Sequence, residues 1–224
     1  VMCPIATKPG QFDVILRRSV ASISGAAGER AQRKIVPFAS VHPRDPDWSR
    51  HLDEVAAAGI RGLKVHPDFQ KVPLDDPAGV PIYRRAAELG LPVLFHMGDD
   101  RYDYSTPERL INLLRQVPDL QVIAAHFGGW RAWAHSYECP LPSCVLYDTS
   151  STLPMIPRDM VLRMLDRFGP ERFLFGTDFP MWSPKEELAR FLALGLGEDV
   201  NEKILYGNFM KLFDLHDEDE TEGA

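Results

Sequence analysis

The sequence predicts an α/β protein built as a (β/α)₈ TIM barrel. Two observations carry this prediction: seven apolar segments have the length and composition of buried strands, and segments with helical periodicity alternate with them. One strand follows another at intervals of about 25 to 30 residues, as in a βα repeat. The alternative, an open doubly wound sheet, would show a glycine-rich phosphate turn after its first strand, and the sequence contains none.

The most informative strands are predicted at 91–96, 120–126 and 172–178. Each is a short apolar run that ends just before a turn containing glycine or proline, which is typical of a strand buried on both faces of a parallel sheet. Each run also delivers one polar, potentially metal-binding side chain at its carboxyl end: His96, His126 and Asp178. Since a barrel collects its active residues at the carboxyl ends of its strands, these residues are expected on one rim.

The first part of the chain supplies three further strands and two helices. The opening segment 1–5 resembles the middle of a strand, and the strands at 34–42 and 60–66 both end in a His-Pro pair. Apolar residues at helical spacing predict helices over 12–23 and 46–58. This succession is the beginning of the βα repeat.

The second part continues the repeat with a strand at 143–148. Thr106 followed by Pro107, and the capping box at 183–186, are both typical of helix starts. The segment 129–143 is rich in tryptophan, proline and cysteine and is predicted to be a long irregular loop. Helices are predicted at 80–89, 106–117, 160–168, 183–194 and 199–213.

Composition and charge indicate one domain and argue against a nucleic-acid partner. The 224-residue chain is 45% hydrophobic without a composition break, so residues 1–213 are predicted to form a single barrel domain. Residues 214–224 carry six carboxylates and no Lys or Arg, which predicts a disordered acidic tail. Removing these six charges from the net charge of -7 leaves -1, and a nearly neutral domain without a basic stripe argues against a nucleic-acid partner.

The sequence also predicts a cytoplasmic protein with no membrane partner. No apolar run approaches the roughly 18 to 20 residues that span a bilayer, and the first residues lack the features of a signal peptide. The three cysteines form no C-x-x-C pair and are interpreted as reduced thiols.

The strand-end residues predict metal chemistry. Imidazole nitrogen and carboxylate oxygen are ligands for zinc and similar cations, and His96 and Asp178 are the predicted ligands. His126 is predicted to be catalytic, either as a second-metal ligand or as an acid that polarises a substrate oxygen. Asp178 is also predicted to be catalytic, because a carboxylate that touches both metal and water can accept the water's proton. A single histidine at a strand end is more often structural, but the threefold repetition favours a site.

Other residues are candidates for substrate binding. Arg101, on the loop after His96, is predicted to hold a substrate carboxylate by a two-point contact, with a solvated loop as the alternative. Trp130 is predicted to line the pocket or to pack on a partner subunit. His66 is assigned to substrate binding, although a structural role is equally consistent with the proline that follows it. Lys64 lies two residues inside its strand and could point into the barrel or outward.

Four motifs together resemble the amidohydrolase superfamily, in particular the amidohydrolase-related branch that also contains decarboxylases similar to aminocarboxymuconate semialdehyde decarboxylase. They are Gly-Leu-Lys-Val-His-Pro at 62–67, Val-Leu-Phe-His-Met-Gly at 93–98, Ala-Ala-His-Phe-Gly-Gly at 124–129 and Phe-Gly-Thr-Asp-Phe-Pro at 175–180. The resemblance implies a (β/α)₈ barrel with a divalent metal, most often zinc or manganese. It also implies that His96 is the metal ligand of the fifth strand, that Asp178 is the ligand and proton acceptor of the eighth, and that His126 is the sixth-strand histidine.

The sequence departs from this family pattern at one point. Family members carry a His-x-His pair at the end of the first strand, and this chain has no such pair. Counting back from Asp178 in the eighth strand makes the opening segment the second strand, so the first strand and helix are expected to be missing from the barrel. With His96 and Asp178 alone as ligands, metal binding by this chain is expected to be weak or absent.

Three functions follow, in order of preference. The first is a metal-dependent hydrolase of a small amide, ester or lactone that uses metal-activated water. The second is a metal-dependent decarboxylase of an aromatic or unsaturated carboxylic acid. The third is an inactive barrel used for binding or assembly. The expected partner is a small-molecule substrate, and the tryptophan-rich loop is consistent with a homodimer.

Overall fold

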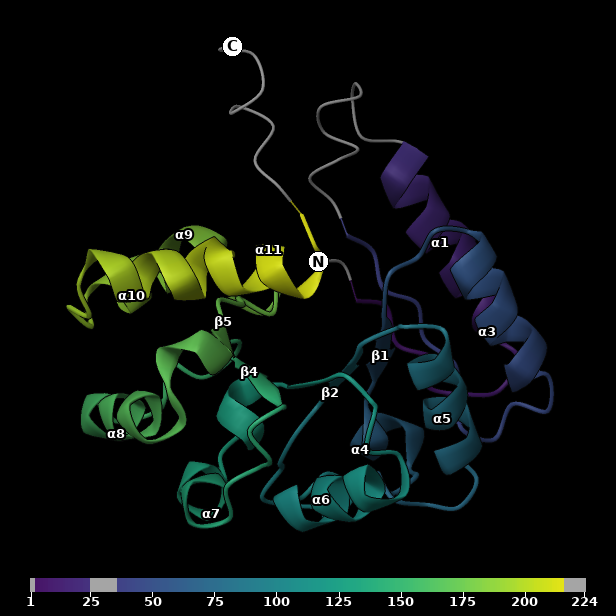
Figure 1. Ribbon diagram of the computed structural model, residues 1–224, viewed down its shortest axis with the longest axis horizontal. Helices are drawn as coiled ribbons and strands as arrows, with labels where there is room; N and C mark the ends of the chain where they lie inside the picture. Colours follow the sequence, from purple (N-terminus) through teal and green to yellow (C-terminus); the bar gives the residue numbers. More distant parts are fainter. Residues whose placement is uncertain (1–2, 25–35, 216–224) are drawn as a thin grey trace.

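A computed structural model describes residues 3–24 and 36–215. At its centre lies a parallel sheet whose order, β1-β2-β3-β4-β5, is also the order of the strands in the chain. Figure 1 shows the helices arranged around these strands as an outer layer. This sequential parallel order confirms the predicted βα repeat. The strands are β1 (Leu63–Val65), β2 (Val93–Phe95), β3 (Val122–Ala124), β4 (Leu146–Asp148) and β5 (Phe173–Leu174).

The strand predicted at 34–42 lies beside β1 but joins it at a single bridge. Ala39 pairs in parallel with Leu63, and the Lys64 amide donates to the Ala39 carbonyl at 2.7 Å. This part of the chain therefore extends the sheet beyond β1. Residues 3–5 of the predicted opening strand belong to no strand, and the rest of that segment lies outside the described residues.

Most predicted helices are present, with ends displaced by one to a few residues. The segment 129–143, predicted to be irregular, contains helix α7, and the His-Pro pair at the end of β1 starts the unexpected short helix α4, with Pro67 in its first turn. The predicted helix 199–213 is divided by a π-helical turn, η3. The helices are α1 (Phe12–Ser24), α3 (Trp48–Ala57), α4 (Pro67–Gln70), α5 (Val80–Glu88), α6 (Pro107–Gln116), α7 (Trp133–Glu138), α8 (Arg158–Phe168), α9 (Pro184–Leu192), α10 (Glu198–Glu202) and α11 (Asn208–Leu212), with short turns η1 (His126–Gly128), η2 (Pro170–Arg172) and η3 (Lys203–Gly207).

The two faces of the sheet have different partners. The strand register aligns Lys64 with Leu94 and Leu94 with Ile123, so these three side chains form one layer that lines a central cavity. The alternate residues, such as Leu63 and Val93, are almost completely buried in the core formed with the helices. Both faces are apolar because a parallel strand surrounded by helices has no solvent-facing side. Lys64 is the exception, and its direction, which the sequence left open, is toward the cavity.

Among the described residues no helix combines the length and the apolar character needed to cross a bilayer. The acidic tail was predicted from residue 214 onward. Only Asp214 and Leu215 of it belong to the described part of the chain, so its disorder stays a prediction.

Gly98 is the point at which the segments after β2 and β3 touch. It forms a parallel bridge with Trp130, whose amide donates to the Met97 carbonyl at 2.7 Å. Its φ is +75°, and an added Cβ would lie 2.5 Å from the Trp130 nitrogen and 2.6 Å from the Gly129 carbonyl carbon. Backbone atoms cannot move aside as a flexible side chain can, so this contact requires glycine.

Gly98→Ala is expected to lower the free energy of unfolding by about 2 to 5 kcal/mol, because left-handed strain and backbone overlap both act. Gly90→Ala is the matched control: its φ is +65°, but an added Cβ meets nothing within 4 Å. That variant should lose only the strain, about 1 to 2 kcal/mol. Urea unfolding of both variants measures the difference, and equal losses would show that the loop contact is unimportant for stability.

Candidate active site

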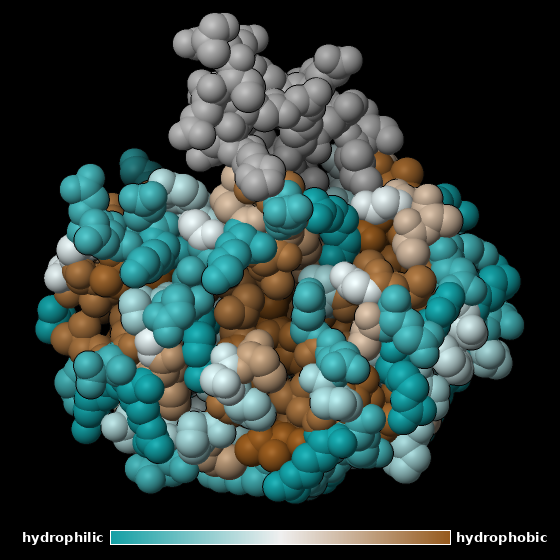
Figure 2. Space-filling view, viewed as in Figure 1, coloured by the Kyte–Doolittle hydropathy of each residue, from teal (hydrophilic) through white to brown (hydrophobic). Residues whose placement is uncertain are grey.

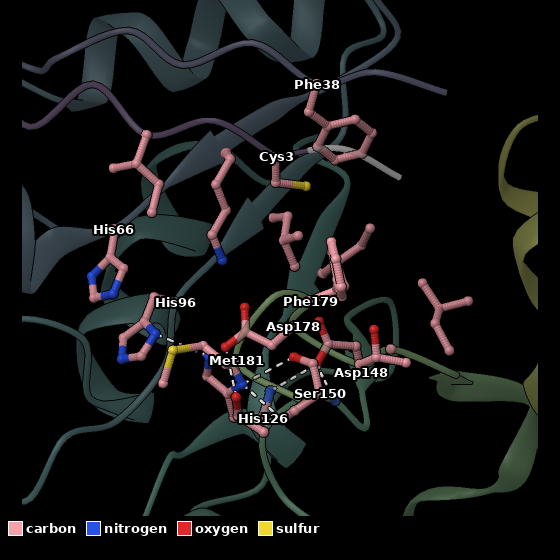
Figure 3. A pocket seen from close by; sticks show the side chains of 18 of the residues that line it. Cys3, Phe38, His66, His96, His126, Asp148, Ser150, Asp178, Phe179 and Met181 are labelled. Carbon is pink, nitrogen blue, oxygen red and sulfur yellow. Dashed lines mark hydrogen bonds between the residues drawn. The ribbon is translucent and has the colours of Figure 1, made fainter. Parts of the chain in front are cut away.

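A cavity of about 1410 Å³ opens among the strand ends and the inner face of the sheet. Figure 2 shows apolar residues gathered in a hollow near the middle of the visible face. Inside the cavity, polar side chains lie at the strand ends and apolar side chains such as Leu94, Ile123 and Leu174 cover the inner sheet. Figure 3 shows His66, His96 and His126 in sequence along one wall, with Asp148 and Asp178 nearby.

The three histidines come together because their strands are neighbours in register. Val65 pairs with Phe95, so the residues that follow them, His66 and His96, stand side by side. Their rings stack with centroids 3.8 Å apart, and the His96 ring meets the His126 ring edge to face at 4.7 Å. All three are nearly inaccessible to solvent, at 3 to 8% exposure.

Asp148, at the end of β4, anchors this row. Its Oδ1 accepts hydrogen bonds from the His126 amide and the Ser150 amide, both at 2.9 Å, and from the Ser150 hydroxyl at 2.6 Å. The carboxylate therefore fixes the backbone on both sides of the His126 ring. The sequence prediction missed this role, although an aspartate at the end of a predicted strand was a signal of the same kind as Asp178.

The hydrogen bonds determine which ring nitrogens carry protons. The Ser150 carbonyl lies 2.8 Å from His126 Nδ1, and because a carbonyl only accepts, that nitrogen must donate. In the neutral ring Nε2 then accepts, and its neighbour at 3.0 Å is His96 Nδ1, which must be the donor. His96 consequently presents an unprotonated Nε2, and this buried atom has no hydrogen-bond partner within the described residues.

Asp68, on helix α4, faces the same point. Its Oδ2 lies 3.8 Å from His96 Nε2 and 3.7 Å from His66 Nδ1, and it is 2.9 Å from the Ser105 hydroxyl. The other oxygen, Oδ1, is buried without a partner in the described part of the chain. Burial raises the pKa of the Asp68 carboxyl from 3.8 to about 6.

His66, Asp68 and His96 thus form a group of acceptors with few donors. Their ligand atoms lie within 4.8 Å of one another. Burial, reinforced by Lys64, lowers the pKa of His66 to about 3, and burial also lowers the pKa of His96, so both rings are neutral at pH 7. Two neutral imidazoles, a carboxylate and two unpartnered acceptor atoms fit a divalent cation. Because the two rings are nearly parallel, one must tilt for both nitrogens to point at one ion.

The predicted ligand Asp178 lines the same cavity, but no contact with His96 is present among the described residues. The Ser151 hydroxyl donates to Asp178 Oδ2 at 2.6 Å, and the Trp182 indole donates to that hydroxyl at 3.1 Å. The backbone of Asp178 is left-handed, with φ at 55°, as is that of His126, with φ at 62°. Strained non-glycine residues of this kind concentrate at functional sites.

The predicted substrate-binding residues His66, Trp130 and Arg101 all line the cavity. Arg101 already holds a carboxylate, because its Nε and one terminal nitrogen donate to the two oxygens of Asp99 at 2.8 and 2.7 Å. This pair lowers the pKa of Asp99. A substrate carboxylate would have to compete with Asp99, so the two-point contact stays a prediction.

A sheet of sequential parallel strands with helices outside it and a histidine-lined cavity at the strand ends is the arrangement of a TIM barrel. A family model described as amidohydrolase matches residues 15–215, and the chain therefore belongs to the amidohydrolase family. This confirms the resemblance that the four sequence motifs indicated. No curated protein matches the chain.

Solved structures share the fold and confirm the barrel. An uncharacterized TIM-barrel protein from Bordetella bronchiseptica is 25% identical, with a TM-score of 0.71 over 88% of this chain and 72% of that one. The 5-carboxyvanillate decarboxylase of Sphingomonas paucimobilis is 16% identical, with a TM-score of 0.72 over 92% and 72%. A dihydroxybenzoic acid decarboxylase from Polaromonas sp. JS666, with bound manganese and the inhibitor 2-nitroresorcinol, is 17% identical, with a TM-score of 0.72 over 94% and 78%.

The raised pKa of Asp68 gives a prediction for the metal-free protein. A carboxyl whose pKa is higher when folded makes the protein less stable as pH rises from about 4 through 6, because the unfolded state has already released the proton. Asp68→Asn should therefore be more stable than wild type at pH 7.5 by up to about 3 kcal/mol. The advantage should shrink through pH 6 and vanish below about pH 4.

Urea unfolding of wild type and Asp68→Asn in a chelating buffer from pH 4 to 7.5 measures this difference. Asp75→Asn, which removes a carboxylate paired with Arg109 at 2.7 Å, is the control and should give no gain at any pH. An Asp68→Asn variant that is less stable than wild type at pH 7.5 would contradict the assigned burial cost.

Proposed function

We propose that this protein is a metal-dependent decarboxylase that removes CO₂ from an aromatic or unsaturated carboxylic acid. The observation that carries the proposal is the buried hydrogen-bonded row from Asp148 through Ser150 and His126 to His96, which borders a cavity with an apolar inner wall. Decarboxylation needs a proton source and a site that strips water from a carboxylate, and this arrangement offers both. The named decarboxylases among the similar structures support it and move it ahead of hydrolysis, the first preference from sequence.

In the proposed reaction the bond between carbon and carboxylate breaks, CO₂ leaves, and the remaining electron pair on carbon takes one proton. His126 is the proposed donor. Its Nδ1 proton is held by the Ser150 carbonyl, so Nε2, which accepts a hydrogen bond from His96 Nδ1 in this structure, must first take up a proton that it would then deliver to the reacting carbon. Burial lowers the pKa of His126, which makes its protonated form a ready donor, and Asp148 opposes this shift.

The proposed cation is manganese or zinc, held by His66, Asp68 and His96. A bound divalent ion supplies Lewis-acid polarisation of a substrate oxygen. This donor set differs from the pair His96 and Asp178 predicted from sequence, and it does not require the His-x-His pair that the sequence lacks. Asp178 remains in the proposal as an acid-base group, oriented by Ser151.

Hydrolysis of a small amide, ester or lactone is the second candidate. Its support is the family itself and the carboxylate of Asp178, which borders the cavity and could accept a proton from attacking water. The two reactions differ in their products, because hydrolysis adds the elements of water to the substrate and decarboxylation releases CO₂.

The proposal includes a cytoplasmic location and a small-molecule substrate. The free thiols of Cys3, Cys139 and Cys144 support a reducing compartment. A homodimer remains part of the proposal because Phe179 and Met181, beside Asp178, are each more than 70% exposed.

Incubation with 2,6-dihydroxybenzoate or 5-carboxyvanillate, in the presence of manganese or zinc, should release CO₂ without incorporation of ¹⁸O from labelled water. His126→Gln should lower the rate about 10²- to 10⁴-fold, the usual effect of losing a general acid. His135→Gln, which changes an exposed histidine paired with Glu108, is the matched control and should keep the wild-type rate. Incorporation of ¹⁸O into the product of an ester or lactone would favour the hydrolase, and a His126→Gln variant with full activity would refute the proposed acid.

Manganese or zinc at 100 times its dissociation constant should stabilise the metal-free protein by about 2.7 kcal/mol. The gain should be largely absent in Asp68→Asn and retained in Asp53→Asn, whose carboxylate lies at the surface beside Arg85. Calorimetric melting with and without each ion measures both effects. An equal gain in the two variants would place the ion elsewhere.

A further inference from the structure

Lys64 is a buried cation that the mechanism above does not use. It lies on the inner face of β1 and is 8% exposed, and it lines the cavity. In the described part of the chain its side chain forms no ion pair and no hydrogen bond. Buried charges are normally paired, because removal of an ammonium from water costs several kcal/mol.

The side chains around Lys64 do not neutralise its positive charge. Its neighbours in the same layer, Leu94 and Ile123, are apolar and cannot neutralise it. The nearest cavity carboxylates are engaged elsewhere: Asp148 accepts three hydrogen bonds, and Asp178 accepts one from Ser151. Neither lies within the 4.0 Å that defines an ion pair with Lys64.

His66, His96 and His126 lie nearer to the carboxyl ends of the strands than the layer that contains Lys64. His66 follows Lys64 by two residues on the same face of the sheet, which is about 6 to 7 Å along the strand. The three rings contact one another, Asp68 and Ser150, whereas the Lys64 side chain on the same wall makes no ion pair or hydrogen bond in the described part of the chain.

We propose that Lys64 is the carboxylate-binding residue of the cavity and that it selects organic acids over neutral amides, esters and lactones. An anionic ligand would supply the missing counter-charge, and the apolar wall would contact the remainder of the molecule. The inference rests on the proposed function for its location, but it concerns binding. It holds for a decarboxylase and equally for a hydrolase whose substrate carries a carboxylate.

The test compares salicylate with salicylamide, two ligands of similar shape that differ in charge, by calorimetric titration. Wild type should bind salicylate at least tenfold more tightly. Lys64→Met should lose about 10- to 100-fold in affinity for salicylate, as expected for a charge-assisted hydrogen bond, and should bind salicylamide unchanged. Lys64→Arg, which keeps the charge, should retain the preference, and Lys185→Met, which removes an exposed lysine, should behave as wild type.

Melting of the ligand-free variants separates binding from a structural role. If Lys64 is kept for a ligand, Lys64→Met should melt at a temperature no lower than wild type, because the Lys64 side chain makes no ion pair or hydrogen bond in the described part of the chain. A lower melting temperature, or equal affinity of wild type for the two ligands, would overturn the proposal. If salicylate binding depends on Lys64 but no acid is turned over, the carboxylate site stands and the proposed reaction fails.

Discussion

The candidate site depends on the Asp148 carboxylate. Its three hydrogen bonds hold the backbone at His126 and at Ser150, and the Ser150 carbonyl then determines the tautomer of His126. Through the contact between the two rings, that choice leaves the outer nitrogen of His96 without a proton. A group at the end of β4 thus decides what a residue at the end of β2 can bind. Loss of Asp148 would free the tautomers of both rings.

The site is assembled from features that reduce the stability of the protein when no ligand is present. Two acceptor atoms, Asp68 Oδ1 and His96 Nε2, are buried without partners in the described residues, and burial raises the pKa of Asp68. His126 and Asp178 have left-handed backbones. Each feature is unfavourable alone, and the apolar core between sheet and helices offsets them. Their concentration around one cavity is the strongest structural sign that this cavity has a function.

The fold explains why the polar residues can occur there. Outward residues of the strands pack against helices, whereas inward residues form an apolar layer beneath the strand ends. Because the strands are parallel and adjacent, the residues that follow them in sequence meet at one rim. The same geometry puts Lys64 on the inner face of β1, where it lines the cavity two residues before His66.

The sequence by itself determined the repeating strands and helices, and the positions of His96, His126 and Asp178 at strand ends, because hydrophobic periodicity and turn residues are local signals. It also placed Lys64 and His66 two residues apart on one strand.

The sequence could not determine that His66 stacks on His96, since that contact follows from the register between β1 and β2. Nor could it show that Asp68 belongs to the site, and although Asp148 had the same strand-end signal as Asp178, its contacts were not predictable. Asp68 lies near His96 only because Pro67 starts a short helix. Asp148 contacts His126 only because β4 pairs with β3. Tertiary structure decided these points because hydrogen-bond partners and tautomers depend on distances between segments that are far apart in the chain.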